Sequence, residues 1–243
     1  MPVERFSLKI VLLLVVIPLA CASSIHPPPK ENTYSERRSE MVKQQLAARD
    51  IDNPAVLQAM GEVPRHQFVP AAIQPYAYTD SPLPIGLEQT ISQPYIVALM
   101  TQLVEPKSEE KALEVGTGSG YQAAVLSKLV QRVFTIEIIE ELAETARTTL
   151  QEAGFLNVTV RYGDGYAGWE EEAPFDIIMV TAAAPVIPQP LIEQLADGGR
   201  LVLPVGPVGG IQELILIRKE KGKIREKKII PVRFVPMTGK VRE

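Results

Sequence analysis

The sequence predicts an α/β protein with a mostly parallel sheet that helices cover on both faces. From residue 111 onward, short apolar segments alternate with longer segments whose apolar residues recur at helical spacing. Segments such as "FDIIMV" are almost wholly apolar, which is typical of parallel strands buried on both faces. Two strand-like segments around Lys221 and Gly222 predict antiparallel strands at the C-terminal edge, and helical patterns before residue 62 predict an N-terminal helical extension.

Two helices are expected before the sheet. "SERRSEMVKQQLAARD" carries apolar residues on one helical face, and Ser35 is placed to cap its start. In "NPAVLQAMGEV", Asn53 is the expected cap and Pro54 takes the first helical position. The stretch from residue 64 to 86 is rich in proline and aromatic residues and has no clear period. It is expected to be a binding or lid segment, or a surface wrap packed on the core.

A third helix is expected in "QTISQPYIVALM", which begins with neutral hydroxyls and amides and ends in apolar residues. Thr90 and Ser92 are placed to cap this helix. No His, Cys or pair of acids stands beside them. From this stretch alone, capping of the helix is the simplest interpretation of the two hydroxyls.

The elements of the sheet follow in order. "KALEVGTGSGYQAAVLSKLV" is expected to form a strand, a glycine loop and a helix, and "RVFTIEIIEELAETARTTLQEAG" a strand and a helix with Gly154 as its C-terminal cap. "VTVRYGDG" and "FDIIMV" are expected strands, and "PQPLIEQLADGGRLVLPVG" predicts a helix, a glycine turn and a fifth strand. Strands that alternate with helices in this way favour a parallel sheet.

Composition narrows the chemistry. The chain has 243 residues, 46% of them apolar, and a formal charge of −4 without a basic stripe, which argues against nucleic acid as a partner. One cysteine, Cys21, and two histidines, His26 and His66, cannot form a disulfide framework or a metal cluster. His66 has no expected partner for base catalysis and is interpreted as a packing residue. The chemistry must rest on carboxylates, hydroxyls, backbone groups or a bound cofactor.

The N-terminus has the pattern of a secretory signal peptide. Arg5 and Lys9 precede the apolar run "IVLLLVVIPLA", and the small-residue site "ACA" follows. The run is too short for a comfortable membrane span. We expect residues 1–22 to be a signal peptide, 23–34 a linker and 35–243 one domain. Cys21 as a lipidated N-terminus and a buried helix are the alternatives.

Glycines and acids mark the expected ligand site. Gly116, Gly118 and Gly120 follow the first parallel strand and open a helix, where glycines allow a sharp turn and close approach of a ligand. Glu137 ends the second strand and Asp164 the third, at the sheet edge where such folds bind nucleosides. A tight turn without a ligand and solvated carboxylates are the plain alternatives.

The glycine spacing favours one class of cofactor. NAD-binding loops have the spacing G-x-G-x-x-G and a seat for pyrophosphate. Here the spacing is G-x-G-x-G and Glu114 leads it on the strand. This suits a nucleoside without pyrophosphate, and S-adenosylmethionine is such a molecule.

The chain resembles the protein-L-isoaspartate O-methyltransferases from about Arg37 to Thr238. The resemblance rests on "VPRHQFVP", "YTDSPLPIG", "QTISQPYIVA", "LEVGTGSGYQAAVL", "GDGYAGW", "FDIIMVTAAAP", "GGRLVLPVG" and "VRFVPM". "TISQP" and "VRFVP" are the most specific of these. Two features depart from the family: Glu88 stands where similar bacterial sequences often carry glycine, and the N-terminus resembles a signal.

The resemblance implies a Rossmann-like S-adenosylmethionine-dependent methyltransferase fold and methyl transfer to the free α-carboxylate of L-isoaspartyl residues in damaged proteins, without a metal. It implies that Ser92 is the active-site serine. The cofactor-binding residues it implies are Glu114, Gly116, Thr117, Gly118, Gly120, Glu137, Asp164, Gly165 and Thr181. The substrate-binding residues it implies are Gln89, Thr90, Ala182, Ala183, Val232 and Phe234.

Two other functions and two locations stay open. An NAD-dependent oxidoreductase would share the fold, and a cofactor-binding paralogue without turnover is the second alternative, to which Glu88 is the one pointer. The signal pattern predicts export or a periplasmic location, whereas the resemblance implies the cytoplasm.

Overall fold

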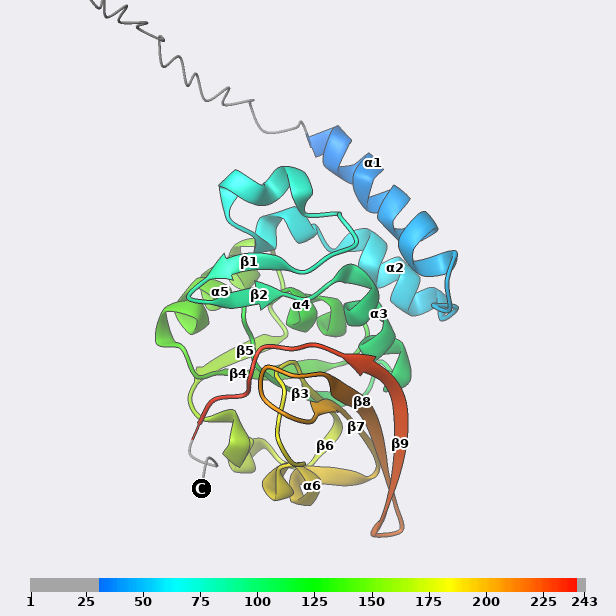
Figure 1. Cartoon of the computed structure of the whole chain (residues 1–243), viewed down its shortest axis with the longest axis vertical. Helices are drawn as coiled ribbons and strands as arrows, with labels where there is room; N and C mark the ends of the chain where they lie inside the picture. The colour runs from blue at the N-terminus through cyan, green and yellow to red at the C-terminus, as the bar shows by residue number, and fades with distance from the viewer. Residues whose placement is uncertain (1–30, 240–243) are drawn as a thin grey trace, which may run out of the picture.

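A seven-stranded sheet forms the centre of the computed structural model, which describes residues 31–239 (Figure 1). The strand order is β5-β4-β3-β6-β7-β8-β9, in which the first five strands are parallel and the last two antiparallel. The strands are β3 (Lys111–Val115), β4 (Arg132–Glu137), β5 (Val158–Tyr162), β6 (Phe175–Val180), β7 (Leu195–Val205), β8 (Gln212–Glu220) and β9 (Lys223–Val232). The predicted fold class is confirmed.

The remaining elements surround this sheet. The helices are α1 (Glu31–Met41), which continues as a π-helical turn (Val42–Ala47), α2 (Pro54–Glu62), α3 (Pro94–Leu103), α4 (Tyr121–Ser127), α5 (Glu140–Glu152) and α6 (Gln189–Gln194). Short 3₁₀ helices lie at Arg65–Phe68, Ala71–Tyr76, Gly165–Ala167 and Glu170–Glu172. A separate hairpin pairs β1 (Leu83–Gly86) with β2 (Gln89–Ile91).

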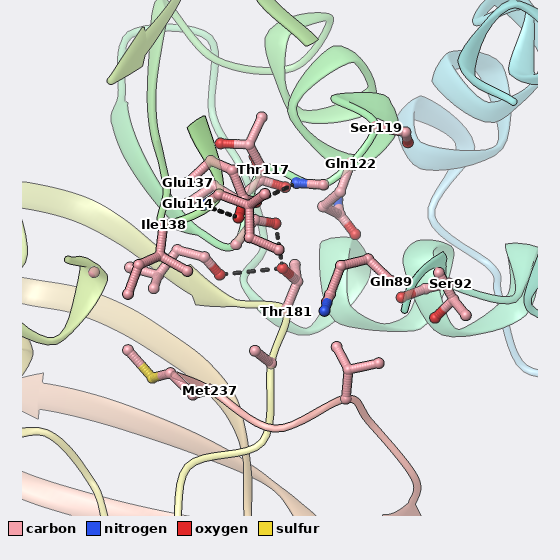
Figure 2. Close-up of a pocket in the computed structure, with 18 of the residues that line it drawn as sticks. Gln89, Ser92, Glu114, Thr117, Ser119, Gln122, Glu137, Ile138, Thr181 and Met237 are labelled. Carbon is pink, nitrogen blue, oxygen red and sulfur yellow. Dashed lines mark hydrogen bonds between the residues drawn. The ribbon is translucent and has the colours of Figure 1, made fainter. Parts of the chain in front are cut away.

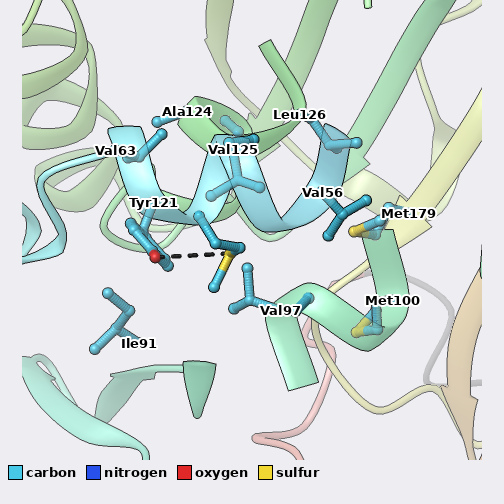
Figure 3. Packing of buried hydrophobic residues seen from close by; sticks show 14 of the residues in the cluster. Val56, Val63, Ile91, Val97, Met100, Tyr121, Ala124, Val125, Leu126 and Met179 are labelled. Carbon is cyan, nitrogen blue, oxygen red and sulfur yellow. Dashed lines mark hydrogen bonds between the residues drawn. The ribbon is translucent and has the colours of Figure 1, made fainter. Parts of the chain in front are cut away.

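The sheet has a hydrophobic core on each face because side chains alternate along its strands. Ala112 of β3 belongs to one core and Leu113 to the other, and Ile177 and Ile178 of β6 divide in the same way. Side chains of α2, α3 and α4 gather with Met179 of β6 in the first core (Figure 3). Burial on both faces explains why these strands are apolar throughout.

The expected helix ends are partly confirmed. The Asn53 side chain accepts hydrogen bonds from the N–H groups of Ala55 and Val56, and Pro54 begins α2. Gly154 has a φ of +83° and lies two residues beyond Glu152, the last residue of α5. Its N–H bonds to the Gln151 carbonyl, which closes the helix as a C-terminal glycine does.

The start of the first helix was predicted wrongly. α1 begins at Glu31, so Ser35 lies within the helix and is not its cap, and the last four residues of the expected linker are helical. Tyr34 is buried and its ring stacks on His66 at a centroid distance of 4.0 Å. Packing of this aromatic residue adds a turn that polar sequence alone does not indicate.

Two further segments can be compared with expectation. The stretch from residue 64 to 86 holds two 3₁₀ helices and β1. Phe68 and Tyr78 are buried, as a surface wrap packed on the core requires, whereas Tyr76 is exposed. The expected glycine turn lies inside the bounds of β7, which begins at Leu195. Gly198 has a φ of +84°, and the pairing with β6 shifts register between Phe175 and Ile177 at this point.

The segment after β9 returns across the carboxyl ends of the parallel strands, beneath the β1–β2 hairpin (Figure 1). Ala183 pairs with Pro236, donating its N–H to the Val235 carbonyl and accepting from the Met237 N–H. Residues 89–92 and 235–238 therefore lie close together at the carboxyl edge of the parallel strands.

The expected signal peptide lies outside the described residues. Between residues 31 and 239, no helix has both the length and the apolar character that crossing a bilayer requires.

Candidate active site

Two pockets adjoin at the carboxyl edge of the parallel strands. The first is lined by the glycine loop after β3, the end of β4, β2 and the segment 235–238 (Figure 2). The second lies among β2, the start of α3 and the segment 231–235. Four residues line both pockets: Thr90, Ser92, Thr181 and Val235. Ligands in the two pockets would therefore meet at these four residues.

The glycine loop is shaped by Gly116, whose φ is +95°. A Cβ at this position would lie 2.5 Å from the hydroxyl oxygen of Thr181. That hydroxyl donates its proton between two carbonyl oxygens, that of Gly116 at 2.5 Å and that of Val115 at 3.1 Å. Glycine thus lets Thr181, just after β6, fasten the loop that follows β3.

Glu137 ends β4 as predicted and is buried at the floor of the first pocket. One carboxylate oxygen accepts the Gly118 N–H at 2.8 Å and the other accepts the Ile139 N–H at 3.0 Å. These bonds fix the carboxylate beside the glycine loop. Each oxygen retains accepting capacity for the hydroxyl groups of a ribose.

Glu114 is completely buried beneath the same pocket. One oxygen accepts the Thr135 hydroxyl at 2.5 Å, and the Thr135 oxygen is 2.6 Å from that of Thr117. The other oxygen has no hydrogen-bond partner among the described residues. Burial, reinforced by the nearby charge of Glu137, raises the pKa of Glu114 to about 8. An unsatisfied buried carboxyl oxygen beside a pocket is a natural seat for a cationic ligand.

Ser92 does not cap α3. The cap position is Gln93, without a side-chain cap bond, and Thr90 lies within β2. The Ser92 hydroxyl forms no hydrogen bond with any residue between 31 and 239, although it faces both pockets. The capping interpretation of Thr90 and Ser92 is therefore wrong, and both hydroxyls are available to a ligand.

A buried arginine holds the Ser92 backbone. Arg65 donates to the Ser92 carbonyl and to the Ala77 carbonyl, both at 2.7 Å, and its guanidinium lies 4.8 Å from the centre of the Tyr121 ring. Burial lowers the pKa of Arg65 to about 10, so the group stays charged at neutral pH. The serine is thus positioned by a buried residue of the 3₁₀ helix at Arg65–Phe68.

Most residues implied by the resemblance do line the pockets. The first pocket is lined by Gln89, Thr117, Gly118, Gly165 and Ala182 in addition to those already described. Figure 2 shows Gln89 pointing toward Thr181 across this pocket. Val232 and Phe234 line the second pocket.

Three expected residues lie beside the pockets rather than in them. A Cβ at Gly120, whose φ is +88°, would crowd Leu150 of α5, so this glycine serves the turn and helix packing. Asp164 caps the 3₁₀ helix at Gly165–Ala167 by accepting the Tyr166 N–H at 3.0 Å. Ala183 is fully buried and its backbone pairs with the segment after β9.

Several lining residues were missed from the sequence. Ile138 and Ile139 line the first pocket, as do Tyr121, Gln122 and Met237. The two isoleucines directly follow Glu137, so their place at the strand end was a usable signal. Met237 reaches the pocket only because the C-terminal segment crosses the sheet, which no local pattern indicates.

His66 lies away from both pockets, as the packing interpretation predicted. Its Nδ1 is 2.8 Å from the Tyr78 hydroxyl oxygen, and its ring stacks on Tyr34. Within residues 31–239, no group of three or more His, Cys, Asp or Glu is placed to hold a metal ion.

The lining of the first pocket fits S-adenosylmethionine. It includes two acids, Glu114 and Glu137, and no Lys, Arg or His among the described residues. These carboxyl groups, which a nearby cation keeps ionised, suit a cofactor with a sulfonium and an ammonium group and are a poor match for a pyrophosphate. Ile138, Ile139 and Met237 add an apolar surface suited to an adenine ring.

The chain matches known proteins over nearly its whole described length. The model of the family protein-L-isoaspartate(D-aspartate) O-methyltransferase matches residues 36–242. A protein-L-isoaspartate O-methyltransferase of Opitutus terrae is 51% identical over 234 residues, covering 96% of this chain and 98% of that protein. One from a Polaromonas species is 56% identical over 205 residues, covering 84% and 94%.

Solved structures agree. A protein-L-isoaspartate O-methyltransferase with 28% identity superimposes with a TM-score of 0.76, over 84% of this chain and 66% of that one. A Plasmodium falciparum structure assigned to the same enzyme class, in complex with S-adenosyl-L-homocysteine, has 26% identity and a TM-score of 0.72, over 83% and 98%. The chain is an S-adenosylmethionine-dependent enzyme that methylates L-isoaspartyl residues in proteins, and it belongs to the protein-L-isoaspartate(D-aspartate) O-methyltransferase family.

Proposed function

We propose that methyl transfer takes place where the two pockets meet, with Ser92 holding the attacking carboxylate of the substrate. The observation that carries this proposal is the set of four residues common to both pockets, Thr90, Ser92, Thr181 and Val235. A cofactor in the first pocket and a peptide in the second would approach each other only there. Of the four side chains, those of Thr90 and Ser92 lie on the hairpin side.

The residues at this junction need only position the reactants. S-adenosylmethionine, when bound, supplies a methyl group on a positively charged sulfur. The substrate α-carboxylate has an ordinary pKa of about 3.5, so it is ionised at neutral pH and no residue has to remove a proton. The new bond joins a carboxylate oxygen to the methyl carbon as the bond from that carbon to sulfur breaks. Orientation of this kind contributes roughly 7–11 kcal/mol to lowering a barrier.

Neutral donors suit this task. The Ser92 and Thr90 hydroxyls and the Gln89 amide donate hydrogen bonds to the carboxylate without neutralising it, as a lysine or arginine would. Small Ala182 leaves room for the peptide backbone beside Thr181. Val232 and Phe234 supply apolar contacts along the peptide in the second pocket.

The first pocket holds the cofactor through complementary groups. Glu137 accepts from the ribose hydroxyls, and Glu114 faces the cationic amino-acid end near Gly116, Thr117 and Gly118. Asp164 acts through the turn that presents Gly165, where a Cβ would collide with Val115.

Ser92→Ala tests the proposal. Methyl transfer from radiolabelled cofactor is measured on matched isoaspartyl and aspartyl peptides. We expect the parent to label only the isoaspartyl peptide and the variant to be slower by one to two powers of ten, because a hydrogen bond to a charged group contributes about 1.5–3 kcal/mol. Cofactor affinity should be unchanged. Equal rates for parent and variant would exclude this role for Ser92.

We also propose that residues 1–22 are a signal peptide and that the mature chain begins near Ser23. The charged start, apolar run and "ACA" support this, and export or a periplasmic location would follow. N-terminal sequencing of protein from its native host tests it. An intact N-terminus on soluble cytoplasmic protein would show that the segment is not processed.

A further inference from the structure

One cation lines the second pocket. Within the described chain, Arg233 is the sole charged residue among those that line it; the others are apolar, hydroxyl or amide residues and proline. Arg233 is exposed, between buried Val232 and half-buried Phe234. Its guanidinium forms no hydrogen bond or ion pair with residues 31–239. The charge is therefore available to a ligand in this pocket.

The facing wall offers no competing acid. Gln93 lines the pocket opposite the 231–235 segment, and its amide donates to an Asp80 carboxylate oxygen at 2.8 Å. The other Asp80 oxygen lies 3.3 Å from the Arg49 guanidinium. Asp80 is already paired, so it adds little negative potential to the pocket. Among the residues that line the second pocket, the one formal charge is therefore the positive charge of Arg233.

The position of Arg233 separates it from the reacting atoms. The residues common to both pockets mark the place of methyl transfer, and Arg233 lines only the second pocket. A peptide whose isoaspartyl carboxylate lies at Ser92 extends along the second pocket at about 3.3 Å per residue. The side chains that come near Arg233 are then those of neighbouring residues.

We propose that Arg233 makes the enzyme select isoaspartyl sites that have an acidic residue close by in the sequence. This rests on the proposed meeting of peptide and cofactor at Ser92. An aspartate or glutamate beside the damaged residue gains an ion pair with Arg233, whereas a lysine is repelled. Arg233 is thus a specificity residue and takes no part in methyl transfer itself.

The test compares kcat/KM for three sets of isoaspartyl peptides, in which Glu, Gln or Lys is moved through the two positions on each side of the isoaspartyl residue. At the most sensitive position, the parent should prefer Glu over Lys by about two- to fivefold, the range of an exposed ion pair. Arg233→Gln should remove this preference and Arg233→Glu should reverse it. Raising salt should weaken the preference of the parent and the reversed preference of Arg233→Glu, and should leave Arg233→Gln unchanged.

Arg225→Gln is the matched control. Arg225 is exposed on β9, eight residues away and roughly 25 Å along an extended chain, so the variant changes net charge equally without touching the pocket. It should keep the parent's preference. If Arg233→Gln slows all peptides equally, or leaves the preference intact, the proposal is overturned. Absence of methyl transfer by the parent on every peptide would instead refute the assignment of the reaction.

Discussion

At the scale of single residues, burial changes the acidity of Glu114. A carboxyl that is ionised in water is held with a pKa of about 8 by burial, with one oxygen left unsatisfied below the cofactor pocket. Without cofactor, this residue is therefore mainly protonated at neutral pH. A cationic ligand that approaches it favours the ionised form. If the cationic end of the cofactor lies at Glu114, as proposed, its binding should be accompanied by the loss of a proton from this residue.

This predicts how stability depends on pH. Between its unfolded pKa of 4.5 and its folded pKa of about 8, the native protein binds a proton that the unfolded chain does not. The free energy of unfolding without cofactor should therefore decrease as pH rises through this window. Glu114→Gln removes that proton site. The free energy of unfolding of this variant, relative to that of the parent, should therefore increase from pH 5 to pH 9. Urea unfolding at several pH values measures it, and parallel curves for the two proteins would contradict it.

At the scale of elements, the β1–β2 hairpin explains why similar bacterial sequences often carry glycine where this chain has Glu88. Gly86, Leu87 and Glu88 all have positive φ, of 94°, 50° and 60°. The turn thus needs left-handed residues at both of its central positions, where glycine or asparagine is preferred. The family resemblance pointed to glycine at Glu88, and the backbone supplies the physical reason. Glutamate at this position therefore strains the turn that precedes Gln89 and Thr90. It does not alter the residues that line the junction of the two pockets.

Glu88→Gly should stabilise the protein by about 0.5–1 kcal/mol. Holding a residue with a Cβ in the left-handed conformation costs roughly 1–2 kcal/mol of folding free energy. Glycine avoids this cost, but its greater conformational freedom in the unfolded chain offsets about 0.5–1 kcal/mol of the gain. Glu88→Ala is the control, because it removes the same charge but keeps the Cβ. Urea unfolding of both variants separates the causes. Equal stabilisation by alanine would assign the effect to charge.

The elements also show what the sequence could reveal. The strands, the glycine loop and Glu137 were predictable because local periodicity and strand ends identify them. The added turn around Tyr34 was not, because it depends on a partner far away in the chain, the ring of His66. The same holds for Met237, which reaches the cofactor pocket through pairing of its segment with Ala183.

At the scale of the whole molecule, one buried ion pair connects distant parts of the chain. Arg200 of β7 makes two bonds of 2.8 Å to the carboxylate of Glu110, just before β3. It also donates to the carbonyls of Val104 and Glu105 at 2.7 Å, just after α3. Both side chains are buried, with 6% and 9% of their surface exposed. The helix that follows Ser92 is thereby fastened to the central sheet.

Removing one partner should therefore be costly. Glu110→Ala leaves a buried guanidinium without its counter-charge, and we expect the free energy of unfolding to decrease by about 3–5 kcal/mol. Glu105→Ala is the matched control. It removes an ion pair with Arg218 that lies at the surface, where the Glu105 side chain is 63% exposed. That variant should lose at most about 1 kcal/mol. Because α3 follows the Ser92 loop, methyl transfer by folded Glu110→Ala should decline more than its cofactor affinity, as measured by titration. Equal losses of stability in the two variants would show that the buried pair does not fasten the helix to the sheet.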